Sequence, residues 1–583
     1  MKRRHFLQAM GMAAPGAALV AKHHQGVSGD REQFGPKVFF YDDGRHYSGL
    51  YQFAPPLEPT DLTYAVDQLV DSGVDTLLYS AGLEGGVVQY GSQVAQKWGD
   101  NVDVWHHPIF YRASLNLHQL VADGNDPIRI LAERCHQKGM LFIPTCPVCI
   151  IGPSIRGDKE VERGFGRKSD FVFDNPQYYV GEDDHPKAKF LGRMFGTERL
   201  NFLHAEVRRE RFQIFEELLT NYESDGVELD LSLDNEFGPL CRFGEVAQLA
   251  PVLTQWIRDI REVALKTERA QGRRKRIYIR IPSGSPSVWR IPGFEVETWV
   301  AEKLVDGLVC MSPYKKETAK NALLMFDQDL DLSAAVRLTR ETGCRVLAGV
   351  TTYLGRQLES TATAPMVWAA AALAYDKGAD GFGLSSGGWA PNGWPWTASE
   401  YETLRFLGQP DLLATADKNY RVRSLAGGAS DPMPLFPIQD PILPIRLSEG
   451  KPLTLPFAIA DDLPQWQALG RVKSVRLRVR VTSIEPSLDK LAIRLNGRNL
   501  PDSIRNDIDL HFRVLENMVV SPYGYILEYH LSPDHFPKKG TNQVEVTLLK
   551  RDPRISSSID VLDVDCHIDY RHHQNFEDSP IQY

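Results

Sequence analysis

Eight short apolar segments alternate with helical patterns between residues 36 and 420, and this alternation constrains the fold more than any other feature. The expected strands are 38–41, 74–79, 141–143, an acidic strand within 224–236, 276–281, 308–311, 345–350 and 381–384. Strands that alternate with helices form parallel sheets, and eight such units are typical of a closed (β/α)8 barrel. An open doubly wound sheet is the alternative, but no Gly-rich phosphate-binding motif follows the first strand.

A Gly/Pro-rich connector between residues 427 and 444 separates this region from a second one with a different period. Beyond it, apolar and polar residues alternate at a period of 2, as in 472–481, which predicts strands of an antiparallel β-sandwich. A chain of 583 residues is long enough for two folded units. The predicted division is a leader (1–30), the barrel (31–426), a linker (427–445) and the β-sandwich (446–583).

The N-terminus has the features of an export signal. Arg3 and Arg4 precede Phe6-Leu7 and an uncharged stretch from Ala9 to Ala21, a pattern typical of twin-arginine leaders. Lys2 replaces the Ser of that motif, so a soluble basic start is the alternative. The apolar run is too short to span a bilayer. We therefore expect a periplasmic or secreted protein without stable membrane insertion once the leader is removed.

The composition of the chain indicates which classes of binding partner and which cysteine roles to expect. A net charge of −9 and a pI near 6.0 do not favour nucleic-acid binding, which uses basic faces. Seven cysteines is an odd number and argues against a disulfide scaffold. Cys146 and Cys149 have the spacing of a redox motif but follow a strand, which favours a local disulfide or two buried thiols. The sequence shows no metal-ligand spacing and no cofactor motif, so we expect neither a bound metal nor a cofactor. The sequence does not indicate the oligomeric state.

The acidic strand carries the main functional signal. Val227, Leu229 and Leu231 alternate with Glu228 and Asp230, so the two acids share one face of a strand that is otherwise apolar. Two neighbouring carboxylates in a plain core would be costly, whereas a polar pocket at the C-terminal mouth of a barrel accommodates them. The alternative is a structural role in which arginine partners hold the acids.

Other polar side chains are expected at the same mouth, because they follow the C-terminal ends of other strands. Asp230 is the expected nucleophile or base and Glu236 the general acid, with Glu228 as the alternative acid. Arg280, on the next strand, can pair with either acid of the acidic strand and keep it ionised. The substrate-binding candidates are Arg280, Asp42, Glu84, His106, Tyr314 and Trp389. Paired carboxylates with aromatic residues suit a carbohydrate, although the fifth to eighth strands end without an acid.

Three short motifs resemble a known family. They are Asp126-Pro-Ile128 before Gly139, Glu206-Val-Arg208 before Asp225-Gly-Val-Glu-Leu-Asp230, and Gly293–Trp299 before Val305-Asp-Gly307. Together they are similar to the family-10 glycosyl-hydrolase-like barrel proteins, many of which are exported and carry a C-terminal β-domain. The resemblance implies catalytic acids at Asp230 and Glu228. The chain departs from the family at 232–239, where relatives often have Arg-His-Pro, which puts the substrate in question.

The sequence therefore predicts an exported glycoside hydrolase that cleaves an oligosaccharide or polysaccharide by paired-carboxylate chemistry. The alternative is a non-catalytic carbohydrate-binding protein on the same scaffold. A carboxyl pair about 5 to 10 Å apart facing the mouth would favour hydrolysis, and one isolated acid would favour binding.

Overall fold

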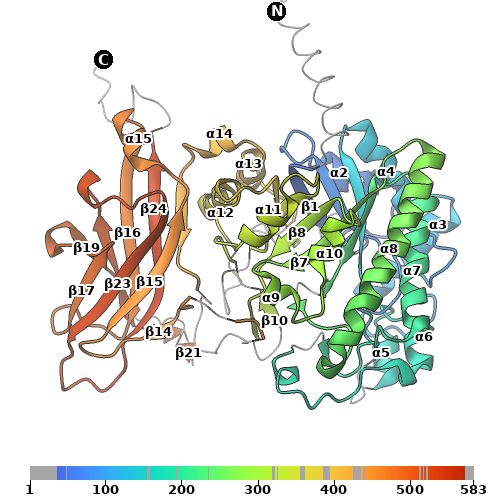
Figure 1. The fold of residues 1–583 in the computed structure, drawn as a ribbon, viewed down its shortest axis with the longest axis horizontal. Coiled ribbons are helices and arrows are strands. Elements are labelled where there is room, and N and C mark those ends of the chain that lie inside the picture. Colours follow the sequence, from blue (N-terminus) through green and yellow to red (C-terminus); the bar gives the residue numbers. More distant parts are fainter. Residues whose placement is uncertain are drawn as a thin grey trace, which may run out of the picture.

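Eight parallel strands close into a barrel in the computed structural model of this protein (Figure 1). Their order around the barrel is β1-β12-β11-β8-β7-β4-β3-β2, and the pairing of β1 with β12 closes the ring. The strands are β1 (Val38–Asp42), β2 (Thr76–Ser80), β3 (Leu141–Pro147), β4 (Gly226–Asp230), β7 (Arg276–Pro282), β8 (Gly307–Met311), β11 (Arg345–Val350) and β12 (Gly381–Leu384). Each coincides with a predicted segment, so the barrel prediction is confirmed and the open sheet is excluded.

The structure describes residues 36–46, 49–153, 158–191, 195–233, 236–317, 322–324, 326–352, 354, 361–384, 394–424, 435–437, 440–510, 514–515, 518–519 and 523–571. The predicted leader therefore lies outside the described residues. Of the helices in the described part, none is long and apolar enough to cross a membrane. All seven cysteines, Cys146 and Cys149 included, are buried free thiols, so no local disulfide forms between these two.

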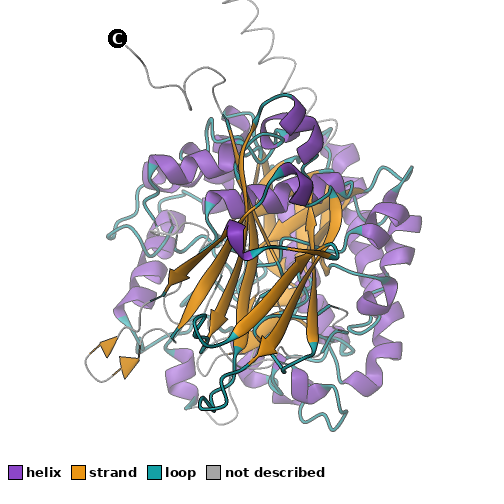
Figure 2. Ribbon diagram, turned by 90° about the vertical axis from the view of Figure 1, so that its left-hand side faces the viewer, coloured by secondary structure: helices purple, strands orange, loops and turns teal. Residues whose placement is uncertain are grey.

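Helices lie around the barrel (Figures 1 and 2). The main ones are α2 (Pro59–Asp67), α3 (Pro108–Ala122), α4 (Pro127–Gln137), α7 (Ala205–Thr220), α8 (Val246–Gln271), α10 (Val296–Ala301), α11 (Ser333–Thr339), α12 (Ala364–Asp376) and α13 (Ala398–Arg405). The start of α4 shows why the sequence forms a helix there. Asp126 caps it by accepting hydrogen bonds from the backbone N–H groups of Ile128 and Arg129, and Pro127 occupies the first turn.

Short elements fill the connections between the barrel strands and helices. They are α5 (Lys159–Arg163), α6 (Asp170–Asp174), the hairpin of β5 (Ser232–Leu233) and β6 (Glu236–Phe237), α9 (Pro286–Trp289), the hairpin of β9 (Lys315–Glu317) and β10 (Ala322–Leu324), and α14 (Pro410–Leu413). Most of them follow the C-terminal ends of strands, the end at which barrel loops build functional sites.

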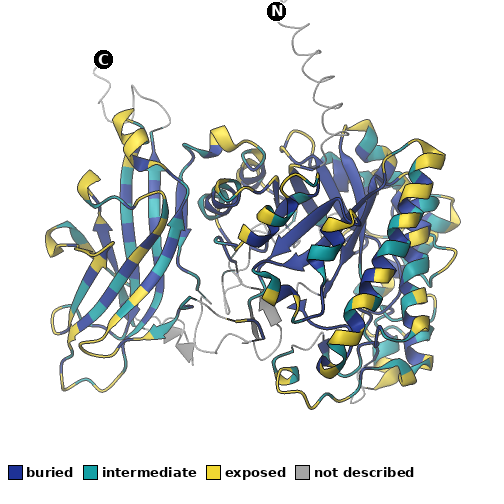
Figure 3. Ribbon diagram, viewed as in Figure 1, coloured by how far each residue is buried: buried dark blue, intermediate teal, exposed yellow. Residues whose placement is uncertain are grey.

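The barrel strands are buried along almost their whole length, as Figure 3 shows. Gly226 begins β4 with a φ of +142°, and a Cβ there would lie 1.9 Å from the carbonyl oxygen of Arg276. Only glycine fits so close to the neighbouring strand β7. This contact sets the start of β4, and the acids at its far end depend on that register.

The C-terminal region forms a β-sandwich, as predicted. One sheet has the order β13-β24-β16-β22-β19, with β14 also paired to β24, and the other has the order β15-β23-β17-β18. The strands are β13 (Lys418–Arg421), β14 (Ile445–Arg446), β15 (Pro452–Ile459), β16 (Val472–Thr482), β17 (Lys490–Leu495), β18 (Arg498–Asn499), β19 (Arg505–Asp509), β22 (Gly524–His530), β23 (Gly540–Lys550) and β24 (Asp560–Tyr570). The hairpin β20 (Val514–Leu515) and β21 (Met518–Val519) and the helix α15 (Leu463–Ala468) are appended to it.

The two regions share a packed boundary. Strand β13 lies in the range 31–426 predicted for the barrel but pairs with β24 of the sandwich. Ala369 and Leu373 of α12 belong to the sandwich core. At the same boundary the Lys418 Nζ donates to Asp461 Oδ1 at 2.8 Å, and Tyr570 OH donates to the same oxygen at 2.5 Å. The sandwich is therefore anchored on the barrel through α12 and β13.

Candidate functional site

Strands β4 and β7 bring two acids and one arginine together inside the barrel. Asp230 lies opposite Arg280 in the parallel register. Arg280 donates from Nε to Glu228 Oε1 at 3.2 Å and from Nη2 to Glu228 Oε2 at 2.9 Å, and its Nη1 lies 3.6 Å from Asp230 Oδ2. Arg280 thus pairs with both acids, the contact expected from the sequence.

The two acids differ in their access to solvent. Glu228 is fully buried, and both of its carboxylate oxygens are engaged by the forked guanidinium of Arg280. Asp230 is 7% exposed and ends its strand. Of the two, Asp230 is the one that a molecule in the mouth can contact.

The environment of Asp230 favours its neutral form. Burial raises its pKa to about 6, the charge of Glu228 adds to this rise, and Arg280 opposes it. Ser232 partly stabilises the anion, because its backbone N–H and its hydroxyl donate to Asp230 Oδ1 at 2.9 and 2.5 Å. Asp230 therefore keeps a proton in part of its population near neutral pH.

Tyr41, on β1, connects this cluster with the loop after its own strand. The Arg280 guanidinium lies 5.3 Å from the centroid of the Tyr41 ring. Burial raises the pKa of Tyr41, and the charges of Asp43, Arg45, Arg280 and Asp230 all act on its hydroxyl. The loop after β1 therefore lies at the same mouth as Asp230.

That loop holds an ionised aspartate. Asp43 Oδ1 accepts from the backbone N–H groups of Arg45 and His46, each at 2.9 Å, and Asp43 Oδ2 contacts the His46 ring and lies 3.5 Å from Arg45 Nη2. Burial acts to raise the pKa of Asp43, but Arg45 and His46 outweigh it and hold the pKa well below its usual range. Asp42, the predicted binding residue, is buried and accepts from the Gly44 N–H at 2.8 Å.

Glu84, in the loop after β2, also has an arginine partner. Arg167 Nη2 lies 2.7 Å from Glu84 Oε1. Burial opposes ionisation, yet Arg167 and Arg45 together lower the pKa of Glu84. Glu84, one of the predicted binding residues, therefore carries a negative charge. The positive charge of Arg45 acts on both Glu84 and Asp43.

Three other predicted residues contact groups other than Asp230 in the described part of the chain, and a fourth lies outside it. Glu236 is buried in the β5–β6 hairpin, where its charge acts on Arg199 and Cys149. His106 is exposed, with its ring 4.5 Å from that of Phe165. Tyr314 donates to the Pro437 carbonyl at 3.2 Å and lies beneath Arg423, on the side of the sandwich. Trp389 lies outside the described residues.

The sequence did not single out Tyr41, Arg45 or Arg167. Tyr41 has the strand position that alternates into the barrel, a signal that was available. Arg45 follows the Asp42-Asp43-Gly44 turn, which also marks it as a mouth residue. Arg167 lies far along the loop after β3, and no local pattern distinguishes it.

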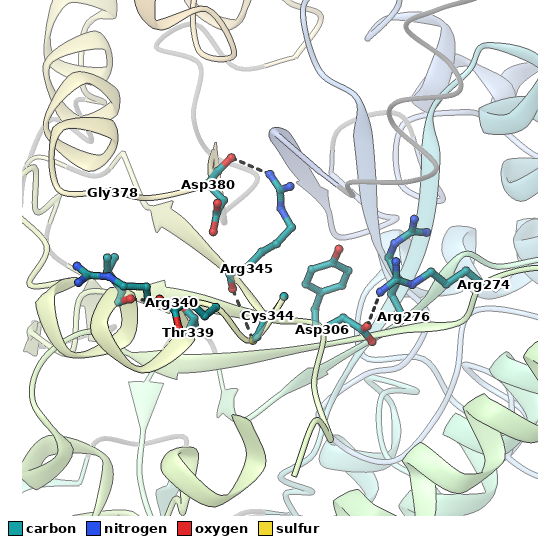
Figure 4. Close-up of a pocket in the computed structure, with 13 residues that line it drawn as sticks. Arg274, Arg276, Asp306, Thr339, Arg340, Cys344, Arg345, Gly378 and Asp380 are labelled. Carbon is teal, nitrogen blue, oxygen red and sulfur yellow. Dashed lines mark hydrogen bonds and ion pairs between the residues drawn. The ribbon is translucent and has the colours of Figure 1, made fainter. Parts of the chain in front are cut away.

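A hollow of about 550 Å³ lies at the opposite end of the barrel (Figure 4). It is lined by residues at the N-terminal ends of strands, such as Arg276 of β7 and Arg345 of β11. One of its acids, Asp306, accepts from the Ile277 N–H at 2.9 Å and from Arg274 at 3.0 Å. In barrels of this type the N-terminal face serves stability, so the candidate site is the mouth.

No group of three or more His, Cys, Asp or Glu side chains in the described residues is arranged to hold a metal ion. The polar groups described at the mouth are carboxyl groups, arginines and tyrosine hydroxyls. We refer to Tyr41, Asp43, Arg45, Glu84, Arg167, Glu228, Asp230 and Arg280 as the mouth cluster.

No protein-family model matches the chain, and no curated protein matches it in sequence. Among solved structures, a cycloisomaltooligosaccharide glucanotransferase from Paenibacillus sp. is 10% identical, with a TM-score of 0.34 over 90% of this chain and 57% of that one. A GH36 alpha-galactosidase from Geobacillus stearothermophilus is 11% identical, with a TM-score of 0.35 over 89% and 56% of the two chains. The chain thus spans little more than half the length of these two.

A class V chitinase from Pseudomonas fluorescens Pf-5 is 13% identical, with a TM-score of 0.33 over 65% of this chain and 100% of that one. Likenesses at these scores carry no argument about activity. No family assignment follows from them, and the resemblance to the family-10 glycosyl-hydrolase-like proteins stays a prediction.

Proposed function

We propose that this protein is a glycoside hydrolase that cleaves an oligosaccharide or polysaccharide, with Asp230 as the proton donor. The observation that carries the proposal is a carboxyl group at the C-terminal end of a barrel strand with its pKa raised to about 6. Glycosidic bond cleavage needs an acid that stays protonated near the working pH, and burial is the usual way to obtain one. This role differs from the nucleophile or base that the sequence favoured for Asp230.

Glu228 fits a positioning role better than a catalytic one. It is fully buried, and Arg280 occupies both of its oxygens. A substrate in the mouth would have to displace Arg280 in order to reach it. Its charge instead acts on Asp230 and raises the pKa of that carboxyl.

Glu84 is the ionised carboxylate that we propose as the partner of Asp230. Its pKa is lowered by Arg167 and Arg45, so it is charged over the range in which Asp230 is still protonated. Such a pair, one acid and one base, is the arrangement that hydrolysis of a glycosidic bond requires. Asp43 is also ionised, but both of its oxygens are held within its own turn.

One observation favours the second candidate function, a non-catalytic carbohydrate-binding protein. Asp43, Glu84 and Glu228 each have an arginine partner, which leaves Asp230 as the one acid of the mouth cluster that is only distantly paired. A barrel with one available acid would bind a saccharide without turning it over.

The test is a comparison of the wild type with Asp230→Asn on a panel of oligosaccharides, with Asp174→Asn as the control at an exposed acid. Loss of a general acid lowers kcat by about 10²- to 10⁴-fold, so we expect that loss in Asp230→Asn with binding retained. Unchanged turnover would remove Asp230 from the mechanism. Binding without turnover in the wild type would favour the second function.

We also propose that residues 1–30 direct export, which places the substrate outside the cytoplasm. This proposal rests on the Arg3-Arg4 motif and the uncharged stretch that follows it.

A further inference from the structure

Trp105 is a partly exposed tryptophan in the loop after β2, on the mouth side of the barrel. It belongs to a short surface run of apolar and aromatic residues, in which Val104 is 79% exposed and Tyr111 is 49% exposed. The rings of Trp105 and Tyr111 lie 5.6 Å apart, with 52° between their planes. Exposed apolar side chains that gather in one place mark an interaction surface, such as a ligand-binding groove.

The backbone of two loops holds the Trp105 ring in place. A Cβ at Gly99 would lie 2.4 Å from Cη2 of Trp105, and a Cβ at Gly166 would lie 2.9 Å from its Cζ3. The Gly99 N–H donates to the Gly166 carbonyl at 3.1 Å, and the His106 N–H donates to the Gly164 carbonyl at 2.9 Å. The loops after β2 and β3 are thus tied together around the indole. Little ordering cost remains for a ligand that packs on it.

The same loops connect Trp105 with the mouth cluster. Gly166 also contacts Trp98, since a Cβ at Gly166 would lie 2.8 Å from Trp98 Cδ1. The Arg45 guanidinium lies 6.0 Å from the centroid of the Trp98 ring. Arg167 of the mouth cluster is the residue after Gly166. The surface at Trp105 is therefore continuous with the mouth, and a chain bound in the mouth can extend over it.

The chemistry of this surface favours a saccharide chain as its occupant. Indole and phenol rings offer flat apolar faces on which the C–H face of a sugar ring packs. The exposed His107 accepts from the Ile109 N–H with Nδ1 at 3.1 Å, so its neutral ring carries an N–H at Nε2 that can donate to a hydroxyl. Apolar rings with a hydrogen-bonding group two residues away match the C–H faces and hydroxyl edges of a sugar.

We propose that Trp105 and Tyr111 form an aromatic platform that binds sugar units remote from the cleaved bond, which makes a long saccharide chain the substrate. This inference rests on the proposed function and narrows its substrate class to chains that reach from Asp230 to the platform. Binding energy from remote units raises kcat/KM without any contact with the reacting atoms. The platform therefore sets the preference for chain length and takes no part in proton transfer.

The test compares two-unit with six-unit gluco-, manno-, xylo- and chito-oligosaccharides on the full-length protein. Binding is measured by calorimetry in the Asp230→Asn background, and KM and kcat are measured with Asp230 intact. Trp105→Ala removes the indole, and Trp105→Phe keeps a smaller aromatic face. Tyr111→Ala changes an exposed side chain and tests the platform independently of the packing of Trp105. The matched control is Trp466→Ala, at a half-buried tryptophan of α15 in the sandwich.

We expect one series in which the six-unit chain binds at least tenfold tighter than the two-unit chain. Trp105→Ala should abolish this gain and raise KM for the six-unit chain at least tenfold, with kcat and the affinity for the two-unit chain unchanged. Trp105→Phe and Tyr111→Ala should each lose part of the gain, and Trp466→Ala should lose none of it.

Three results would overturn the platform. One is equal affinity for the two lengths, or no binding, across the whole panel. Another is a gain that persists in both Trp105→Ala and Tyr111→Ala. The third is a wild-type dimer in sedimentation that Trp105→Ala dissociates, because the rings would then cover a second copy of the chain.

Turnover separates the platform from the proposed function. Binding of the six-unit chain that depends on Trp105 but comes without turnover would end the hydrolase proposal and leave the platform standing. Turnover with the same KM for both chain lengths would end the platform and leave the hydrolase proposal standing.

Discussion

Asp230 should destabilise the folded protein at neutral pH, and Asp230→Asn should relieve this cost. The pKa of Asp230 rises from an ordinary value of 3.8 to about 6 on folding. Because the folded-state pKa is raised, its contribution to stability is fully present below pH 4 and is lost as the pH rises through 6. A difference of this size corresponds to about 3 kcal/mol. Asparagine resembles the protonated carboxyl, so it should remove that loss.

The assay is a melting series of wild type and Asp230→Asn between pH 4 and pH 8. The variant should match the wild type near pH 4 and exceed it by about 3 kcal/mol above pH 7. One kcal/mol moves the melting temperature by about 2–4 °C in domains of 150–250 residues and by less in a larger barrel, so several degrees are expected. A difference between the two proteins that does not change with pH would refute the raised pKa.

Asp225 provides a control of opposite sign on the same chain segment. It begins the turn into β4, and its pKa is lowered because His136, Phe142 N–H and Arg273 outweigh its burial. Its contribution to stability is therefore present at neutral pH and lost as the pH falls through its lowered pKa. Asp225→Asn should destabilise most at neutral pH, where Asp230→Asn stabilises most.

Two further outcomes are expected. In the wild type, kcat/KM should fall on the alkaline side near pH 6, because the donor must be protonated. Glu228→Gln removes a charge that raises the pKa of Asp230, so this fall in kcat/KM should move to lower pH. A fall at the same pH in the variant would exclude Asp230 as the titrating donor. Replacing both Arg3 and Arg4 by Lys should retain the protein in the cytoplasmic fraction of a bacterial host, and unchanged export would show that the twin-arginine motif is not the signal.

The sequence predicted the barrel because its information is local and repeated. Each strand is a short apolar run followed by a helix with its own start and stop signals, such as Asp126-Pro127 and Gly139 around α4. The boundary between the barrel and the sandwich was harder to predict from the sequence. Strand β13 is only four residues long and joins its sheet through β24, about 140 residues later, so no local pattern links it to the sandwich.

The site was predictable where strand geometry sets it. Alternation places Glu228, Asp230 and Arg280 on inward faces, and the parallel register brings Arg280 beside both acids. Loop residues follow no such rule. Glu84 and Arg167 come from different loops that meet only in the folded barrel. Glu236 follows β4 closely in the sequence, but it lies in the β5–β6 hairpin, where its charge acts on Arg199.

The depth of Arg280 explains why two acids of one strand behave differently. Its fork engages Glu228 through two short hydrogen bonds but reaches Asp230 only at 3.6 Å through Nη1. One guanidinium can neutralise one carboxylate, and the deeper acid has the better geometry. Asp230 then experiences burial and a neighbouring negative charge with only partial compensation, which raises its pKa. Burial thus raises the pKa of Asp230 to about 6, and the ion pair one layer below the mouth offsets only part of that rise because its arginine is engaged by Glu228.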